Sequence, residues 1–569
     1  MCRLGDIHCR LINGCMKLTP PNQGCIVVKG YRWCAVYVRQ SWRFVDLEGG
    51  ANGIFKSKDP DEENTDRMAR NLYLKVPKIL NSNGVQFRKF PKGKEKPKVD
   101  LDTNGYTEQR VREYFAVHDY YFLTNPHEFI YDHFPDEEQW QLLARKVTSE
   151  EFNHMVALKW GFFKPFYDTD HPKHIIKAFE GNLSLQFKME TTRSARIAYN
   201  LTKMKGGKLI QGYTGLWNDY VYAEDQGVRK LVKLSLPEIG LYQLDLYSFD
   251  SPVFSGVGEE PRLVATYVVE CDQPSFKSVP NPTNPRYEYG PGDEMQKLGI
   301  EAVSHHGGTI TAREGLVEIL FRCEAYAFQF SHVLEALAAK KEHLAGMSCH
   351  YHDNQNGGVS FLVKLPTEGK YLFKIYCRVR DSSDPFYNVC NYLIVSDMGC
   401  ADMRPYPPVR FGEIGQLLDT PECPVVAESH VCPVIWPSPG QSLALTMGMT
   451  CSEDVLDMQL SHYDYQQETS SDMSDFIWKR VSRKKKLLIE VRFPKPGIYS
   501  LFVHGTEVVR NGLTIQDYFI YVLIVDHPSS PCLAFPIAQS SWMPRFTLFE
   551  PKHRKLTSNT IQRFKVQVG

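Results

Sequence analysis

The sequence lacks the features that mark several large classes of protein. No apolar run approaches the ~18–20 residues that cross a bilayer, so the sequence predicts no membrane span. The first ten residues, MCRLGDIHCR, are charged from position 3 and hold no apolar signal-peptide core, which favours a cytoplasmic chain. The 66 Lys and Arg residues balance 66 Asp and Glu residues. Because a clustered basic excess is missing, no nucleic-acid partner is expected.

Motifs of the common enzyme and cofactor classes are also missing. There is no H-E-x-x-H zinc motif, no phosphate-binding G-x-x-x-x-G-K-[ST] loop and no G-x-S-x-G nucleophile elbow. The chain has 15 cysteines, and the five among the first 34 residues contain no C-x2-C pair, so structural zinc is poorly supported. An odd number of scattered cysteines fits reduced thiols better than a disulfide framework. We therefore expect no metal and no cofactor.

The strongest positive signal is an internal repeat. The motif Pro-x-x-Gly-x-Tyr occurs at Pro237, Pro366 and Pro494, which stand 129 and 128 residues apart. Regular spacing of this kind indicates tandem domains. Each copy lies between alternating apolar segments, as expected for antiparallel strands joined at a glycine bend. The tyrosine position resembles the tyrosine corner of a β-sandwich.

These repeats predict a mainly β, multidomain protein, in keeping with an ordinary globular composition of 43% hydrophobic and 23% charged residues. The strands expected to open and to close each copy lie at 183–187, 316–321 and 443–447, and at 263–269, 392–395 and 518–525. Antiparallel sandwiches are therefore predicted at 167–272, 297–398 and 425–527, followed at 528–569 by a tail or the start of an incomplete fourth unit. The Pro-rich stretches predicted to be linkers are 274–291 and 405–437.

Another type of domain precedes the repeats. Apolar runs at 25–28, 33–38 and 42–46 predict three strands, and the last two are close enough for a hairpin. That turn contains no glycine, so positive φ angles there would be strained.

The next part of the chain is predicted to be less regular. Residues 56–110 are polar, with a basic run at 87–98, and are predicted to form a linker or insertion. Thr148 and Glu151 have the spacing of a capping box, which predicts a short helix to about Leu158 within a connecting segment at 111–166.

Several segments resemble a known family. Residues 4–14, WCAVYV at 33–38 and SWRFVD at 41–46 are similar to the transglutaminase-like domain of the kyphoscoliosis peptidase and hillarin family. YYFLTNP at 120–126 and HFPD at 133–136 extend the match. The resemblance implies the C-terminal half of a papain-like α+β domain, followed by immunoglobulin-like sandwiches of the kyphoscoliosis type. We assign that half-domain to residues 1–55 and expect its other half upstream, in a chain truncated at the N-terminus.

The family's site pairs a nucleophilic cysteine with histidine and aspartate. The resemblance places the retained aspartate at Asp46 and puts Tyr31 where the histidine belongs. A phenol with a pKa of ~10 is a poor general base near pH 7, so Tyr31 is not expected to function. The nucleophile would precede Met1. Cys34 stands in a strand, without the helix N-terminus that stabilises a thiolate.

The other readings of these residues are structural. We interpret Asp46 as a carboxylate that caps a turn at the end of a strand. His118, His127 and His133 lie among aromatic and acidic residues and are interpreted as satisfied or surface histidines rather than as ligands.

Two functions follow from these observations. The first is a non-catalytic scaffold, a degenerate relative of transglutaminase-like cysteine peptidases, with protein partners and the cytoskeletal association that the resemblance implies. The alternative is a cysteine peptidase or protein-crosslinking enzyme of the transglutaminase-like superfamily, whose nucleophile lies upstream of this chain.

Overall fold

The computed structural model describes residues 7–18, 26–50 and 119–568, with gaps in the last range at 191–194, 206–207, 210–216, 250–260, 285–287, 325, 338–343, 354–356, 419–422, 451–455, 466, 468, 483, 510–511, 538–545, 557 and 559–560. The predicted insertion at 56–110 therefore lies outside the described residues. The fold is mainly β, as predicted, and the chain forms two compact units, Met1–Glu288 and Tyr289–Gly569. Among the described helices, none has the length and apolar character needed to cross a membrane.

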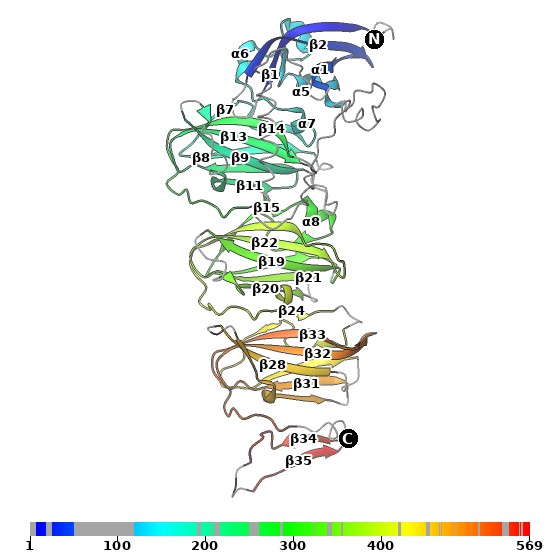
Figure 1. The fold of residues 1–569 in the computed structure, drawn as a ribbon, viewed down its shortest axis with the longest axis vertical. Coiled ribbons are helices and arrows are strands. Elements are labelled where there is room, and N and C mark those ends of the chain that lie inside the picture. Colours follow the sequence, from blue (N-terminus) through cyan, green and yellow to red (C-terminus); the bar gives the residue numbers. More distant parts are fainter. Residues whose placement is uncertain are drawn as a thin grey trace, which may run out of the picture. The chain divides into compact units, whose positions relative to one another are not determined.

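The first unit begins with a five-stranded sheet in the order β4-β3-β2-β1-β5 (Figure 1). Its strands are β1 Cys9–Leu18, β2 Ile26–Val38, β3 Ser41–Val45, β4 Phe122–Thr124 and β5 His133–Pro135. The short helices around it are α1 Leu47–Gly50, η4 Asp119–Tyr121, α5 Pro126–Phe129 and η5 Glu138–Gln141. The segment predicted only to connect two domains thus supplies both edge strands of this sheet, because β4 pairs with β3 and β5 with β1.

Strand β2 corrects one prediction and confirms another. The two strands expected at 25–28 and 33–38 are one continuous strand, since a bulge at Gly30, with φ of 76°, absorbs the irregularity opposite Gly14 and Cys15. The hairpin between β2 and β3 turns at Arg39 and Gln40, whose φ angles are 50° and 61°. The glycine-free turn is therefore strained as expected.

The predicted helix after Thr148 is present but shorter than expected. Helix α6 covers Ser149–His154, and the capping box between Thr148 and Glu151 is complete. The helix ends before Leu158 because Met155 is extended and forms a bridge with Lys173.

A buried lysine of β1 connects the five-stranded sheet to helix α6 by hydrogen bonds. The side chain of Lys17 on β1 is fully buried, and its Nζ donates to the carbonyls of Phe152 and, at 2.9 Å, Met155. These carbonyls end α6, where a cation is favourable.

The first sandwich packs two sheets that are antiparallel except for the parallel pair of β7 with β14. One has the order β10-β9-β13-β14-β7 and the other contains β11-β12-β8-β6. Their bounds are β6 Phe166–Thr169, β7 Ile175–Ala178, β8 Asn182–Met189, β9 Arg196–Lys205, β10 Lys208–Leu209, β11 Val221–Asp225, β12 Arg229–Ser235, β13 Gly240–Phe249 and β14 Arg262–Cys271. Two short helices, α7 Trp160–Phe163 and η6 Asn218–Tyr220, accompany the sheets. Alternate residues of β8 face the core, as its sequence predicted.

The second sandwich repeats this arrangement in the second unit. One sheet contains β19-β22-β23, with β15 and β17 also paired to β23, and the other contains β16-β18-β21-β20. The bounds are β15 Glu288–Pro291, α8 Asp293–Lys297, β16 Glu301–Ala302, β17 Thr309–Ala312, β18 Leu316–Arg322, β19 Phe328–Ala336, β20 Ser348–Asp353, β21 Gly358–Lys364, β22 Gly369–Val379 and β23 Tyr387–Ser396.

The third sandwich and the tail complete the second unit. The sandwich has sheets in the orders β33-β32-β28-β29 and β25-β27-β31-β30, and the tail forms a two-stranded pair. The bounds are β25 Val425–Ala427, β26 Val434–Ile435, β27 Leu443–Met449, β28 Leu456–Asp464, β29 Thr469–Asp472, η9 Ser474–Phe476, β30 Ile477–Val481, β31 Lys486–Val491, β32 Gly497–Val509, β33 Gly512–Val525, β34 Phe546–Glu550 and β35 Lys565–Val568.

The expected linker at 405–437 is not a plain connection. It contains η7 Arg410–Gly412 and β24 Glu413–Gln416, as well as β25 and β26. Strand β24 pairs with β20 in parallel and with β33 antiparallel, so one strand belongs to both sandwiches. The prolines of this stretch predicted an extended chain. The chain is extended, and it forms a strand because it lies beside open edges of the two neighbouring sheets.

All three repeat tyrosines form the corner that the motif predicted. The hydroxyl of Tyr242 donates to the carbonyl of Glu238 at 2.8 Å, and Tyr371 and Tyr499 make the same bond four residues back. All three side chains are almost fully buried. Each corner therefore ties the end of one strand to the start of the next.

We expect Tyr242→Phe to lower the free energy of unfolding of the first sandwich by about 0.5–1.5 kcal/mol, because the hydrogen bond from the Tyr242 hydroxyl to the Glu238 carbonyl is lost. Urea denaturation of the full chain, followed by far-UV circular dichroism, measures this change. Tyr167→Phe is the matched control, since Tyr167 is 56% exposed. Equal unfolding midpoints for the two variants would contradict the corner's role.

Candidate functional site: a buried aspartate and histidine network

Asp46 lies directly after β3, at the start of α1. Its backbone N–H donates to the carbonyl of Tyr121 at 2.9 Å, and its side chain is 1% exposed. Oδ1 accepts the backbone N–H of Gly49 at 3.0 Å, which is the capping contact expected of this carboxylate. A Cβ at position 49 would lie 2.5 Å from Oδ2, so only glycine allows this approach.

Tyr31 contacts Asp46 from the neighbouring strand. The Tyr31 side chain comes from β2, just after the bulge at Gly30, and points into the core of the half-domain. Its hydroxyl donates to the Asp46 carboxylate, at 3.2 Å from Oδ1 and 3.0 Å from Oδ2. The two residues that the resemblance selected are therefore in direct contact.

His133 joins the network from the opposite edge of the sheet. Its Nε2 lies 3.2 Å from Asp46 Oδ2, and its Nδ1 lies 2.6 Å from Asp132 Oδ1. The imidazole is 1% exposed and stacks on Phe129 with ring centroids 3.8 Å apart. Trp33 meets it edge-on at 5.3 Å. Asp46, Tyr31, His133 and Asp132 together form what we call the acid–histidine network.

The pKa values of Asp46 and His133 are shifted in opposite directions. Burial alone would raise the pKa of Asp46, but the bonds from His133, Gly49 and Tyr31 outweigh burial and lower that pKa. Burial alone would lower the pKa of His133, but Asp132 and Asp46 outweigh it and raise that pKa. Both shifts favour the charged pair.

Sequence reasoning missed His133 as a member of this site. It is 87 residues from Asp46, beyond the predicted insertion, and we interpreted it as a satisfied or surface histidine. The His133 imidazole does have hydrogen-bond partners, but one of them is Asp46, the candidate site residue itself. The HFPD match at 133–136 was the available signal, since it extended the resemblance that located Asp46.

Two described cysteines of this sheet, Cys15 and Cys34, lack the environment of a nucleophile. Cys15 on β1 is half-buried, and burial, followed by the charge of Asp136, raises the pKa of its thiol. A catalytic thiolate requires a lowered pKa. Cys34 lies within β2, opposite Leu11 and Val45, and not at the start of a helix.

The fold defines the class of protein first: a five-stranded sheet, which resembles a transglutaminase-like half-domain in sequence, is followed by tandem immunoglobulin-like sandwiches. Residues 293–407, the second sandwich with its flanks, match the family described as "KY-like, immunoglobulin-like domain".

Curated relatives agree with this class. Hillarin of Drosophila melanogaster is 25% identical over 391 residues, covering 66% of this chain and 42% of that protein. Kyphoscoliosis peptidase of Mus musculus is 26% identical over 326 residues, covering 56% and 44%. The Lim and transglutaminase domain protein ltd-1 of Caenorhabditis elegans is 23% identical over 411 residues, covering 70% and 50%. The chain thus spans about half the length of these relatives. It is similar to the kyphoscoliosis peptidase and hillarin proteins over these stretches, as the sequence indicated.

We expect His133→Gln to destabilise the half-domain most at mildly acidic pH. A raised folded pKa means that the imidazolium stabilises the fold fully below its ordinary value of 6.5, and that this contribution is lost as pH rises through the folded pKa. Asp46, with its lowered pKa, contributes above its ordinary value of 3.8. At pH 5.5 both are charged, and breaking the pair costs about 3–5 kcal/mol.

Urea midpoints at pH 5.5, 7 and 9 test this prediction, with the exposed His127→Gln as the control. The difference between wild type and His133→Gln should shrink towards pH 9. A difference that stays constant with pH would show that His133 acts through packing alone.

Proposed function

We propose that this chain is a non-catalytic interaction and scaffold protein in which the transglutaminase-like half-domain has a structural role. The observation that carries the proposal is the contact between Tyr31 and Asp46. At the position where the family's chemistry needs a base, a phenol donates to both carboxylate oxygens. A donor there completes the carboxylate's hydrogen bonds and offers no lone pair basic enough to accept a proton from a thiol.

His133 does not replace the missing base. A general base needs a free nitrogen lone pair within reach of the proton it accepts. Each nitrogen of His133 instead faces a carboxylate, Asp132 on one side and Asp46 on the other. The ring is buried between Phe129 and Trp33, away from solvent.

The sandwiches support the scaffold part of the proposal. The second and third sandwiches share β24 and bury an apolar cluster between them that includes Tyr351, Ile414 and Ile520. A pair of domains fixed in this way presents loops and strand edges in a constant arrangement, which suits protein binding. We extend the resemblance to the family's cytoskeletal association and propose cytoskeletal proteins as partners.

We expect the full chain to show no thiol-dependent turnover. Incorporation of monodansylcadaverine into dimethylcasein, and hydrolysis of fluorescein-labelled casein, are measured at pH 7 before and after alkylation with iodoacetamide. The rates should equal the background in both states, because the site holds no free base. Turnover above background that alkylation abolishes would favour the alternative, a cysteine peptidase or crosslinking enzyme.

The scaffold part is tested by co-sedimentation of the purified chain with actin filaments and by its distribution to the detergent-insoluble cytoskeletal fraction. We expect recovery in the cytoskeletal fraction that is unchanged by alkylation. A chain found only in the soluble fraction, and absent from filament pellets, would contradict cytoskeletal association while leaving the catalytic result intact.

A further inference from the structure

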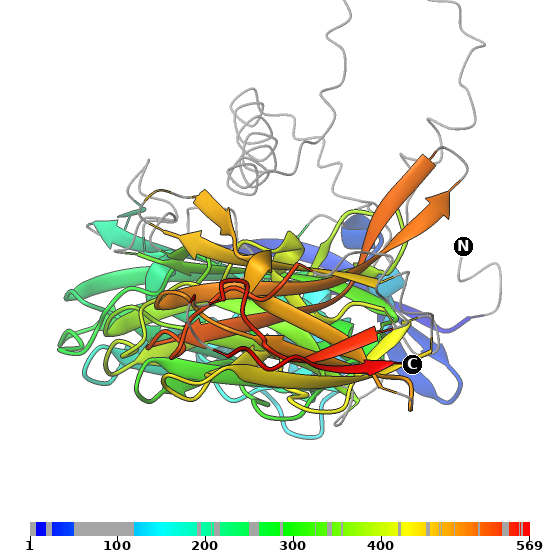
Figure 2. The ribbon, with the colours of Figure 1, turned by 90° about the horizontal axis from the view of Figure 1, so that it is seen from below.

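A long hairpin in the third sandwich has an open strand edge. Strands β32 and β33 pair along their full length, from Gly497 opposite Val525 to Val509 opposite Gly512. On its other edge β33 pairs with β24 only at Phe519 and Ile520. Within the described part of the chain, residues 512–517 therefore have a strand partner on one side only. Figure 2 shows this orange hairpin projecting beyond its sandwich.

The neighbouring strand ends in the same way on the other side of the hairpin. Among the described residues, strand β28 pairs with β32 from Ile498 to Gly505. Within the same described residues, the outer part of the hairpin is a two-stranded ribbon. Backbone N–H and C=O groups on such an edge form a template for another strand.

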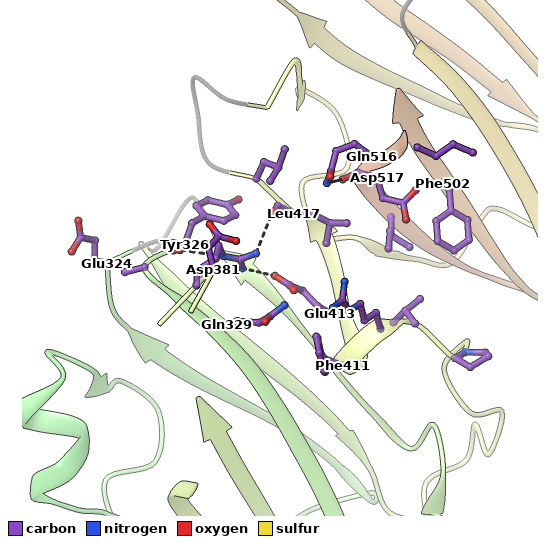
Figure 3. A pocket seen from close by; sticks show the side chains of 18 residues that line it. Glu324, Tyr326, Gln329, Asp381, Phe411, Glu413, Leu417, Phe502, Gln516 and Asp517 are labelled. Atoms are coloured by element: carbon purple, nitrogen blue, oxygen red, sulfur yellow. Dashed lines mark hydrogen bonds and ion pairs between the residues drawn. The ribbon is translucent and has the colours of Figure 1, made fainter. Parts of the chain in front are cut away.

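A cavity lies at the base of this open edge. It has a volume of about 810 Å³ and is bordered by Ile515, Gln516 and Asp517 of β33. Glu324 and Asp381 of the second sandwich lie across it (Figure 3). The cavity is therefore formed by both sandwiches of the second unit, at the point where β24 joins them.

The polar lining of the cavity carries surplus negative charge. The side chains of Glu324, Asp381 and Asp517 have no hydrogen-bond or ion-pair partner among the residues that the structure describes. Burial raises the pKa of Asp517, and nearby His504 only partly offsets this. An unpaired carboxylate in a partly buried place favours a cationic ligand.

Arg380, one of the two arginines of the lining, is already engaged. Arg380 donates to Glu413 at 2.7 Å and to the carbonyls of Tyr326 at 3.1 Å and Leu417 at 3.3 Å (Figure 3). Arg380 is therefore ion-paired with Glu413, and among the described residues it forms no ion pair with the neighbouring Asp381. Arg410, the other cation of the lining, lies over the ring of Phe411 at 5.0 Å.

The remaining wall is apolar and partly open. Phe411, Leu417 and Phe502 line the cavity together with Ile515, which is 73% exposed. An exposed isoleucine beside a cavity and an unpaired strand edge favours contact with another apolar side chain.

We propose that an extended segment of a partner protein, with a lysine or arginine between β-branched residues, adds as a strand to residues 513–517 of β33 and inserts its cation between Asp381 and Asp517. Main-chain bonds to the open edge supply affinity, and the acidic cavity selects the side chain. This surface is separate from the acid–histidine network and goes beyond the proposed function, since it does not depend on whether the half-domain is catalytic.

The test uses the full chain and a fluorescein-labelled peptide, Thr-Val-Thr-Val-Lys-Val-Thr-Val-Thr, followed by fluorescence anisotropy. We expect saturable binding that the combined substitution Asp381→Asn and Asp517→Asn weakens about tenfold, because two charge contacts are removed. Asp397→Asn, an exposed carboxylate on the same unit, is the matched control and should leave affinity unchanged. Binding should weaken at high salt.

Two further probes distinguish the contribution of strand pairing to binding from the contribution of the charged side chain. A peptide N-methylated at alternate residues on its docking edge should not bind, while the peptide with glutamate in place of lysine should bind weakly. Hydrogen exchange should show new protection at 513–517 when the parent peptide is bound. Absence of saturable binding, unchanged affinity in the double variant, or equal binding of the N-methylated peptide would each overturn the proposal.

Discussion

The half-domain depends on the burial of one carboxylate. A buried charge is costly unless donors surround it, and Asp46 obtains its donors from three separate segments: Tyr31 on β2, Gly49 in α1 and His133 on β5. The last of these lies 87 residues further along the chain than Asp46. The domain requires this later segment, because it supplies both edge strands and the imidazole that contacts the carboxylate.

The hydrogen bonds that surround the Asp46 carboxylate also limit the chemistry in which it can take part. In a catalytic triad the acid orients a histidine whose second nitrogen stays free for the nucleophile. Here the imidazole of His133 has a carboxylate at each nitrogen, and Tyr31 donates to the acid from the remaining side. All of these hydrogen bonds are present in the folded chain itself, which supports the structural role proposed for this domain.

Local patterns in the sequence predicted local structure well. The Pro-x-x-Gly-x-Tyr repeat located three sandwich corners, because the bond from tyrosine spans only four residues. The strain at Arg39 and Gln40 followed from the missing glycine in the same way. Helix α6 began where its capping box required, but its end was set by the bridge of Met155 with Lys173, a contact between segments.

Contacts between distant segments escaped prediction for the same physical reason. Nothing in the neighbourhood of His133 shows that it meets Asp46, because their contact arises only when β5 joins the edge of the sheet. Similarly, the prolines of 405–437 correctly indicated extended chain, yet whether such chain becomes a strand depends on open edges elsewhere. Strands β20 and β33 provide those edges.

The shared strand β24 explains why the junction, rather than either sandwich alone, is suited to recognition. An isolated sandwich closes its polar groups within its own sheets, so unpaired charges are left on exposed loops. At the junction β24 must leave β33 after a few residues to enter the third sandwich, and its departure exposes the rest of that edge. The same crossing brings Asp381 of one sandwich opposite Asp517 of the next, while Arg380 of the same lining is already paired with Glu413. The open edge of β33 and the charged cavity therefore both result from the path of β24 between the two sandwiches.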